Sequence, residues 1–299
     1  MNDQKKPLSF KRVLIANRGE IAVRIIRTLR EMGIETVALY SDADEHSLHV
    51  RLADYAYHLK GTSPQDTYLN INLITKAINE SQADAVHPGY GFLSENIAFA
   101  EAVCDQTKAT FIGPNLHSLE VMGNKVKAKQ LIQQHNLPIL PGSNQPLTNF
   151  KHLQQVANDI GFPLIIKASL GGGGRGMRIV KNKNSLQEAY DSCRREALSC
   201  FGVDDLFCER YLESPRHIEI QVLFDKYGQG VHLFERDCSI QRRHQKILEE
   251  APSIYLNDQQ RMMYGDIALK IASLVNYEGL GTVEFICESP DKPYFMEMN

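Results

Sequence analysis

Five glycines lie within six positions, at residues 171–174 and 176, and they follow the apolar stretch FPLIIKAS after a single leucine. Each glycine in an ordered segment costs roughly 0.5–1 kcal/mol of backbone entropy relative to alanine, so the run costs about 2.5–5 kcal/mol. A typical domain has a total stability of only about 5–15 kcal/mol. Two interpretations account for such a cost: a flexible linker, or a loop whose backbone N–H groups cover phosphate groups.

The residues that follow the glycines narrow these interpretations. Apolar and polar residues alternate in MRIVK, and this period of two predicts a strand at residues 177–180 instead of a helix. The GxGxxG pattern at residues 171–176 therefore lacks the helix that a dinucleotide-binding turn aims at a pyrophosphate. A Walker loop is excluded as well, because Met177 and Arg178 stand where it needs Lys and then Ser or Thr.

A strand, a glycine loop and a second strand form a flap that can lie over phosphates, as in protein kinases, but neither HRD nor DFG occurs in this sequence. Lys167 ends the strand before the flap, so it is well placed to neutralise phosphate oxygens. The alternative is an ordinary surface lysine at the end of a strand. The pattern favours a phosphate-covering flap with Lys167 at its base.

Short apolar runs alternate with amphipathic segments in the first part of the chain. RVLIAN, ETVALYS and ADAVHPG are typical of buried strands, and the segments between them have helical spacing. This alternation predicts an α/β domain, with a parallel sheet covered by helices, at residues 1–120. Its turn ANRGEIA has one glycine where a dinucleotide-binding fingerprint needs three.

The pattern changes near residue 115. One helix is predicted over SLEVMGNKVKAKQLIQQH, residues 118–135, and a proline-punctuated segment leads from it to the flap and its flanking strands. We place a small second domain at residues 121–212 and the first part of a third domain at residues 213–299.

Two carboxylates face each other in a hairpin predicted at the end of the chain. The sequence SPDK at residues 289–292 suits a type I turn, and symmetric folding about it places Glu284 opposite Glu297. Facing carboxylates destabilise a bare sheet, and a hard cation between them reverses the effect. Asn299 projects from the same face and adds a neutral oxygen. These three residues predict a magnesium-type site, and an exposed face that tolerates the like charges is the alternative.

Composition excludes several kinds of partner. The net charge is −3 without any block of like charges, which argues against nucleic acid or a membrane surface. No run approaches about 18 apolar residues, and the polar start MNDQKKPLSF lacks the apolar stretch of a signal peptide. The six cysteines form no CxxC pair, so a reducing, cytoplasmic location is expected over a disulfide framework or a zinc site.

Five longer motifs occur along the chain: RVLIANRGEIAVRI, HPGYGFLSEN, IIKASLGGGGRGM, ERYLESPRHIEIQVL and ERDCSIQRRHQKILEEAP. In these motifs, and over essentially its whole length, the chain resembles the biotin carboxylase branch of the ATP-grasp ligases. The resemblance implies a Rossmann-like N-terminal domain followed by an ATP-grasp fold whose C-terminal part is incomplete. It also implies ATP-driven activation of bicarbonate as carboxyphosphate, with Mg²⁺ or Mn²⁺, and transfer of the carboxylate to biotin on a carrier protein.

The same resemblance implies roles for individual residues. Lys125 corresponds to the family lysine that reaches ATP, whereas Lys127 and Lys129 look like solvated helix charges. The segment from Glu209 to Leu212 corresponds to the one that holds the adenine edge through its backbone, and Arg210 stands where relatives often have lysine. The implied nucleotide-binding residues are Lys125, Lys167, Gly173, Gly174, Glu209, Arg210, Tyr211, Leu212, His217, Gln241, His244, Glu284 and Glu297. Among them, His217 and Gln241 are expected near the sugar and His244 at the terminal phosphates. The implied catalytic residues are His244 and Lys246, with Lys246 on bicarbonate, and the implied metal ligands are Glu284, Glu297 and Asn299.

The sequence departs from the family pattern at its end. In relatives the last strand continues past the position of Asn299 into an arginine, a glutamine and a glutamate that hold and deprotonate bicarbonate. We therefore expect a truncated chain that binds Mg-ATP but carboxylates biotin weakly or not at all alone. The implied partners are a biotin carrier protein or domain, a carboxyltransferase and, if complete, a second copy in a homodimer. A carbamoyl phosphate synthetase and a non-catalytic nucleotide-binding remnant are the alternatives.

Overall fold

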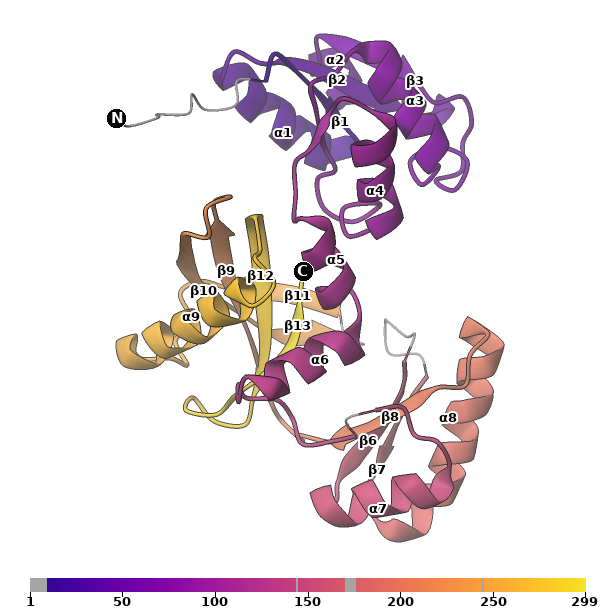
Figure 1. Ribbon diagram of the computed structural model, residues 1–299, viewed down its shortest axis with the longest axis vertical. Helices are drawn as coiled ribbons and strands as arrows, with labels where there is room; N and C mark the ends of the chain where they lie inside the picture. The colour runs from indigo at the N-terminus through magenta and orange to yellow at the C-terminus, as the bar shows by residue number, and fades with distance from the viewer. Residues whose placement is uncertain (1–9, 144, 170–175, 243–244) are drawn as a thin grey trace. The chain divides into compact units, whose positions relative to one another are not determined.

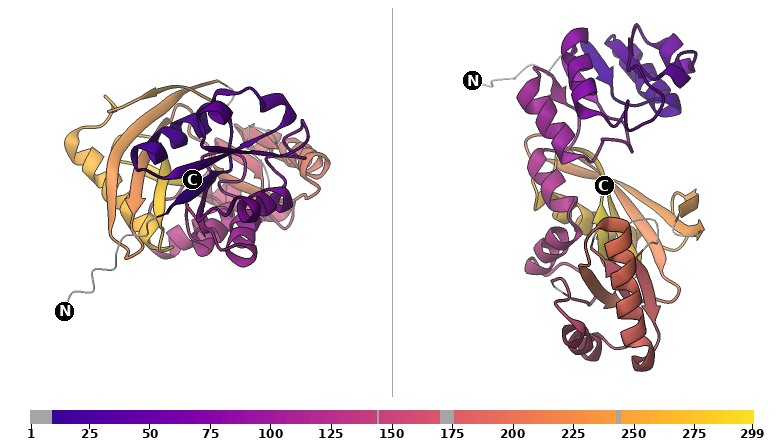
Figure 2. Two further views of the ribbon diagram at one scale, coloured as in Figure 1. Left: turned by 90° about the horizontal axis from the view of Figure 1, so that it is seen from above. Right: turned by 90° about the vertical axis from the view of Figure 1, so that its right-hand side faces the viewer.

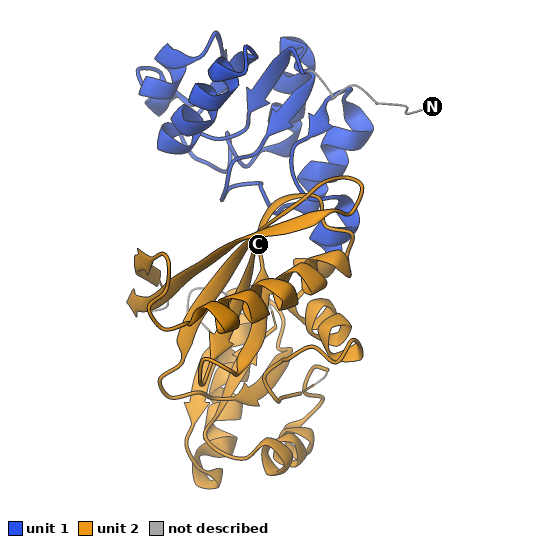
Figure 3. Ribbon diagram, turned by 90° about the vertical axis from the view of Figure 1, so that its left-hand side faces the viewer, with its two compact units in different colours: residues 1–120 blue, residues 121–299 orange. Residues whose placement is uncertain are grey.

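The chain forms two compact units, residues 1–120 and residues 121–299 (Figure 3). The computed structural model describes residues 10–143, 145–169, 176–242 and 245–299. Among these residues, no helix combines the length and the apolar character needed to cross a bilayer. All six cysteines are free thiols.

The first unit is built around a parallel sheet with the strand order β3-β2-β1-β4-β5 (Figure 1). Leu14 packs with residues of helices α3 and α4, whereas Val13 and Ile15 pack with residues of helix α1. Because successive residues of β1 enter different cores, both faces of the sheet are covered, as the alternating pattern predicts. The elements are β1 Arg12–Ile15, α1 Gly19–Glu31, β2 Glu35–Tyr40, the 3-10 turn η1 Asp42–Asp44, α2 Leu48–Leu52, β3 Tyr55–His58, α3 Ile71–Ser81, β4 Ala85–His87, α4 Ile97–Gln106 and β5 Thr110–Phe111.

In the second unit, a small antiparallel sheet has the order β7-β6-β8. Helices α7 and α8 pack on it through a core that includes Leu153, Ile166 and Tyr190, and Figure 2 shows α8 running along the strands. Strand β7 confirms the strand predicted after the glycine run. The elements are α7 Phe150–Ile160, β6 Leu164–Ala168, β7 Met177–Val180, η2 Lys183–Ser185, α8 Leu186–Phe201 and β8 Leu206–Arg210.

A larger antiparallel sheet of the second unit has the order β11-β10-β9-β12-β13. Ile220 and Phe285 from this sheet share a core with Tyr264 of helix α9 and Ile132 of helix α6. In strand β9, alternate residues project to the opposite face, which carries polar side chains. The elements are β9 Arg216–Phe224, β10 Gly230–Arg242, β11 Gln245–Glu250, α9 Asp258–Ser273, β12 Gly279–Cys287 and β13 Pro293–Met298.

The helix predicted over residues 118–135 is in fact two helices, α5 Leu116–Met122 and α6 Lys125–Gln134. Asn124 begins the second helix, and its side-chain oxygen accepts hydrogen bonds from the N–H groups of Val126 and Lys127. The prediction was wrong because Gly123 and Asn124 end one helix and cap the next. This break makes Lys125 the first residue of α6. The division of the second unit at residue 212 stays a prediction.

The hairpin of β12 and β13 pairs Glu284 with Glu297, as the symmetric fold predicts. The turn forms as predicted, and the Lys292 N–H donates to the Ser289 carbonyl at 3.0 Å. The pairs nearer the turn are shifted by one residue, and a bulge next to Glu284 restores the symmetric register. The predicted pair is therefore present, although two irregularities produce it.

Candidate active site

All predicted site residues within the described ranges belong to the second unit. Lys125 opens α6, Lys167 lies on β6, Glu209 and Arg210 end β8 just before Tyr211 and Leu212, His217 lies on β9, Gln241 on β10, Lys246 on β11, Glu284 on β12, Glu297 on β13, and Asn299 follows β13. Gly173, Gly174 and His244 lie outside the described residues. Two groups result: a Lys246 group (His217, Glu219, Gln241, Lys246, Glu284) on the large sheet and a Glu209 group (Lys129, Lys167, Glu209).

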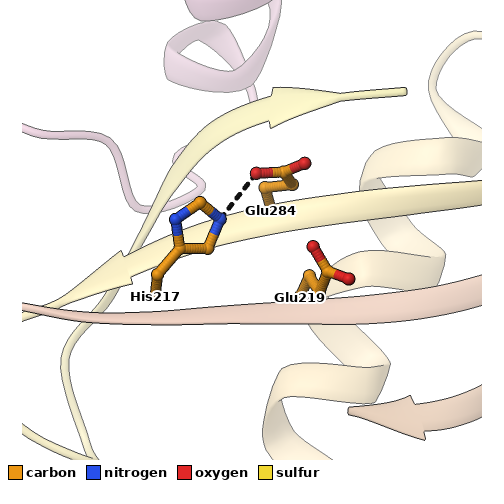
Figure 4. A group of neighbouring side chains, drawn as sticks. All are labelled: His217, Glu219 and Glu284. Atoms are coloured by element: carbon orange, nitrogen blue, oxygen red, sulfur yellow. Dashed lines mark hydrogen bonds and ion pairs between the residues drawn. The ribbon is translucent and has the colours of Figure 1, made fainter. Parts of the chain in front are cut away.

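The Lys246 group is organised by two facing carboxylates. Strands β9 and β12 pair Glu219 directly with Glu284, and the residues are only 3% and 4% exposed (Figure 4). The Lys246 Nζ lies 2.5 Å from Oε2 of Glu219 and 3.0 Å from Oε1 of Glu284. Arg236 adds a second cation, with its Nε 2.5 Å from Oε1 of Glu219. The lysine thus offsets the repulsion that two buried, facing carboxylates would otherwise have.

The ionisation of this group follows from its contacts. Burial alone would raise the pKa of Glu284, but the hydrogen bond from His217 and the charge and hydrogen bond of Lys246 lower it to about 2. Burial likewise opposes the charge of Lys246, yet its bonds to Glu219 and Glu284 raise the pKa of the ammonium above its usual value. The group therefore presents a permanent cation on an ionised pair of carboxylates.

His217 has a defined orientation in the same group. The Gln241 Nε2 donates to the Cys238 carbonyl at 2.9 Å and contacts Nδ1 of His217 at 2.9 Å. Since a carbonyl only accepts, that amide nitrogen is the donor, and Nδ1 of His217 is the acceptor. The proton is therefore on Nε2 of His217, which lies 2.5 Å from Oε2 of Glu284 (Figure 4).

The predicted metal ligands meet at the end of the same hairpin. The Asn299 Nδ2 donates to Oε1 of Glu284 at 2.8 Å, and Oε2 of Glu297 lies 3.2 Å from the Nζ of Lys125. Two carboxylates and an amide on adjacent strands form a hard-oxygen set that fits Mg²⁺. The metal role of these residues stays a prediction.

A second set of potential metal ligands has a different character. Ligand atoms of His217, Glu219 and Glu284 lie within 4.8 Å of one another. The Lys246 ammonium, however, already bridges the two carboxylates. Because a cation there would have to displace Lys246, the hairpin end fits a divalent ion better.

The Glu209 group lies where β8 approaches α6. The Glu209 side chain is 6% exposed; its Oε2 lies 2.6 Å from the Nζ of Lys167, and its Oε1 contacts the Nζ of Lys129. The interpretation of Lys129 as a solvated helix charge was wrong, because its side chain is only 26% exposed. Lys125 and Lys129 are one helical turn apart, so α6 directs both toward carboxylates of the site.

The pKa values of the two lysines in this group are lowered. Burial is the main cause, and the positive charge of Lys125 adds to it for both side chains. The pKa of Lys129 is lowered to about 7, with a further contribution from Lys167, and that of Lys167 is lowered to about 8. An anion bound near them would reverse these shifts.

The backbone around Glu209 is fixed from two sides. Gly142 bridges to Glu209, and a Cβ on Gly142 would lie 2.4 Å from the Cys208 carbonyl oxygen, so only glycine permits this approach. The N–H groups of Arg210 and Tyr211 donate to the carbonyls of Pro141 and Pro163 at 2.8 and 3.0 Å.

These bonds restrict the predicted adenine segment, Glu209 to Leu212. Two of its backbone donors are used within the chain, and the strand already ends at Arg210, whose side chain pairs with Glu288 at 3.2 Å. Among the described residues no backbone partner outside the strands is found for the N–H of Leu212.

Sequence reasoning missed Glu219, Arg236 and Lys129. A usable signal existed for Glu219: in RHIEIQV the polar residues His217, Glu219 and Gln221 alternate with apolar ones, which places them on one face of a strand. For Lys129 the signal was its i, i+4 spacing from Lys125. Arg236 had no comparable signal.

Comparison with known proteins gives the class of this fold and site. The family model described as "Carbamoyl-phosphate synthase L chain, ATP binding domain" matches residues 124–299. That match covers more than half of the chain, so the second unit is an ATP-binding domain of this class. The model described as "Biotin carboxylase, N-terminal domain" matches residues 9–119.

Individual relatives narrow the class. Biotin carboxylase 1 of Bacillus subtilis is 49% identical to this chain, over 97% of this chain and 64% of its own length. The 2-oxoglutarate carboxylase small subunit of Hydrogenobacter thermophilus is 48% identical, over 97% of this chain and 61% of its own length. The structure of a biotin carboxylase-beta-gamma-ATP complex from Campylobacter jejuni superposes with a TM-score of 0.92, at 44% identity over 97% of this chain and 65% of its own. A second structure is the biotin carboxylase domain dimer of the Hydrogenobacter thermophilus enzyme in complex with MgADP, ADP and bicarbonate. It superposes with a TM-score of 0.89, at 47% identity over 97% of this chain and 64% of its own.

The chain therefore belongs to the biotin carboxylase family. It spans 61–65% of the length of these four relatives.

Proposed function

We propose that this chain uses ATP to activate bicarbonate as carboxyphosphate and passes the carboxylate to biotin on a carrier protein or domain. The observation that carries the proposal is the Lys246 group, an ammonium held on two buried carboxylates. A relative 47% identical to this chain was solved with MgADP and bicarbonate, the two classes of ligand that the site would join.

Each part of the site has a role in this reaction. ATP and bicarbonate are both anions, so a site that joins them needs concentrated positive charge. Because its pKa is raised, Lys246 stays cationic wherever bicarbonate is the main species, and it can hold that anion. Lys125 and Lys167 would exchange their carboxylate partners for phosphate oxygens.

The remaining residues orient the site. Gln241 fixes the tautomer of His217, which in turn holds Glu284 in position for a metal. Glu284, Glu297 and Asn299 would hold Mg²⁺, which when bound neutralises charge on the phosphates.

We further propose a biotin carrier, a carboxyltransferase and a second copy of the chain as partners. The support is the family and, for self-association, the relative solved as a dimer of biotin carboxylase domains.

Calorimetric titration of ATP, with and without Mg²⁺, tests the proposal together with an assay of ADP formation. We expect one Mg-dependent nucleotide site per chain and ADP formation that requires bicarbonate and rises only weakly with free biotin, in line with the weak carboxylation expected from the sequence. Stimulation by ammonia or glutamine in place of biotin would favour a carbamoyl phosphate synthetase, an enzyme that the family model matching residues 124–299 also names. Nucleotide binding without bicarbonate-dependent ADP formation would favour a binding remnant, and no nucleotide binding would overturn the proposal.

A further inference from the structure

Two lysines contact the Glu209 carboxylate, although one cation is enough to balance its charge. Lys129 of α6 contacts one oxygen and Lys167 of β6 contacts the other, while the carboxylate itself is 6% exposed. A buried carboxylate is strongly destabilising without a cation, but a single close lysine satisfies that requirement. One of the two lysines can therefore leave Glu209, because the buried carboxylate keeps the other as its partner.

The two lysines differ in how easily they can leave. The Lys167 side chain is 35% exposed and stands at the end of β6 that leads toward the glycine run, whereas the Lys129 side chain is 26% exposed and is fixed to a helix turn. Lys125, one turn earlier on α6, pairs with Glu297, so the helix holds one carboxylate with each lysine. Lys127, between them in sequence, is on an exposed part of the helix.

We propose that Lys129 is a positioning residue: it stays on Glu209 and thereby frees Lys167 to move from Glu209 to a bound nucleotide. This inference rests on the proposed function, because it needs a nucleotide in the site. Without Lys129, Lys167 is the only cation left for a buried carboxylate and is retained there. Nucleotide affinity then falls even though no ligand contact has been removed.

A double-mutant cycle tests this mechanism by calorimetric titration of MgADP. We expect Lys129→Met to weaken binding by about tenfold or more, the scale of one lost charge-assisted hydrogen bond. Lys127→Met removes the same charge from the same helix and should change the affinity by less than about twofold. Lys129→Arg should bind like the wild type.

The deciding variant is Glu209→Gln, which removes the carboxylate that retains Lys167. In that background, adding Lys129→Met should change the affinity by less than about twofold, because no buried charge remains to compete for Lys167. In this double variant only the Lys167 ammonium loses its carboxylate partner, and that side chain is 35% exposed. Thermal melting checks that each variant folds.

An equal loss of affinity from Lys129→Met in both backgrounds would show direct ligand contact and overturn the inference, as would a Lys129→Met variant that binds as well as Lys127→Met. Either result leaves the proposed function intact, since the wild type still binds. A wild-type chain that binds no MgADP would instead end the proposed function, and this inference with it.

Discussion

Glu219 and Glu284 lie directly opposite each other on strands β9 and β12, and the Lys246 ammonium bridges them at 2.5 and 3.0 Å. Most sheets avoid such a pair of like charges. Here the lysine comes from a third strand, β11, which the β10–β11 hairpin brings over the pair by matching Lys246 with Gln241. Lys246 is therefore the cation that the two carboxylates share, whereas Arg236 contacts Glu219 alone.

Removing that cation should destabilise the fold. We expect Lys246→Met to lower the free energy of unfolding by about 3 kcal/mol at pH 7.5, because two buried carboxylates lose a shared partner. Urea denaturation measures the change. Lys76→Met is the control, since its exposed pair with Glu80 at 3.7 Å is worth at most about 1 kcal/mol. Equal effects of the two substitutions would contradict the assigned role of Lys246.

Nucleotide binding should take up protons at pH 8. The pKa values of Lys129 and Lys167 are lowered to about 7 and about 8, so both are partly neutral at that pH, and nearby phosphates raise them again. Uptake of about one proton is expected, and the affinity should fall as the pH rises from 7 to 9. Calorimetry in buffers of different ionisation enthalpy measures the proton count, and a binding enthalpy independent of the buffer would refute this account.

The metal assignment predicts a selective loss in Glu297→Gln. Nucleotide binding without Mg²⁺ should not weaken, because the substitution only releases Lys125 from its carboxylate partner. The strengthening by Mg²⁺ should fall by roughly tenfold or more, the scale of one charge-assisted contact. Glu288→Gln, in the same hairpin but paired with Arg210, is the matched control. If both variants keep the full response to Mg²⁺, Glu297 is not a metal ligand.

Gly142 should be required for the position of Glu209. A Cβ at residue 142 would lie 3.0 Å from the Glu209 Cα and closer still to the neighbouring carbonyl oxygen, so Gly142→Ala must push β8 aside. We expect a loss of about 1–3 kcal/mol of stability and weaker nucleotide binding. Gly161→Ala introduces strain at a φ of +76° but meets no atom within 4 Å, so it should lower stability and preserve affinity. Unchanged affinity in Gly142→Ala would sink the prediction.

The sequence predicted much of this fold because local patterns determine it. The parallel sheet of the first unit and strand β7 follow from periodicity, and the pairing of Glu284 with Glu297 follows from a turn. The irregular register that produces this pair could not be predicted, because the bulge beside Glu284 depends on how β12 pairs with β9 as well as with β13. Lys129 looked solvated for a similar reason. Its i, i+4 spacing places it on the helix face of Lys125, but its partner Glu209 is 80 residues away in sequence, so the spacing does not identify the contact.

A crystal structure of the chain with MgADP would locate both the metal ion and the Lys167 side chain. We expect a metal ion about 2.1 Å from carboxylate oxygens of Glu284 and Glu297, with the Lys167 ammonium moved from Glu209 to the nucleotide. A metal ion between His217 and Glu219 with Lys246 displaced, or a nucleotide bound away from both groups, would contradict this expectation.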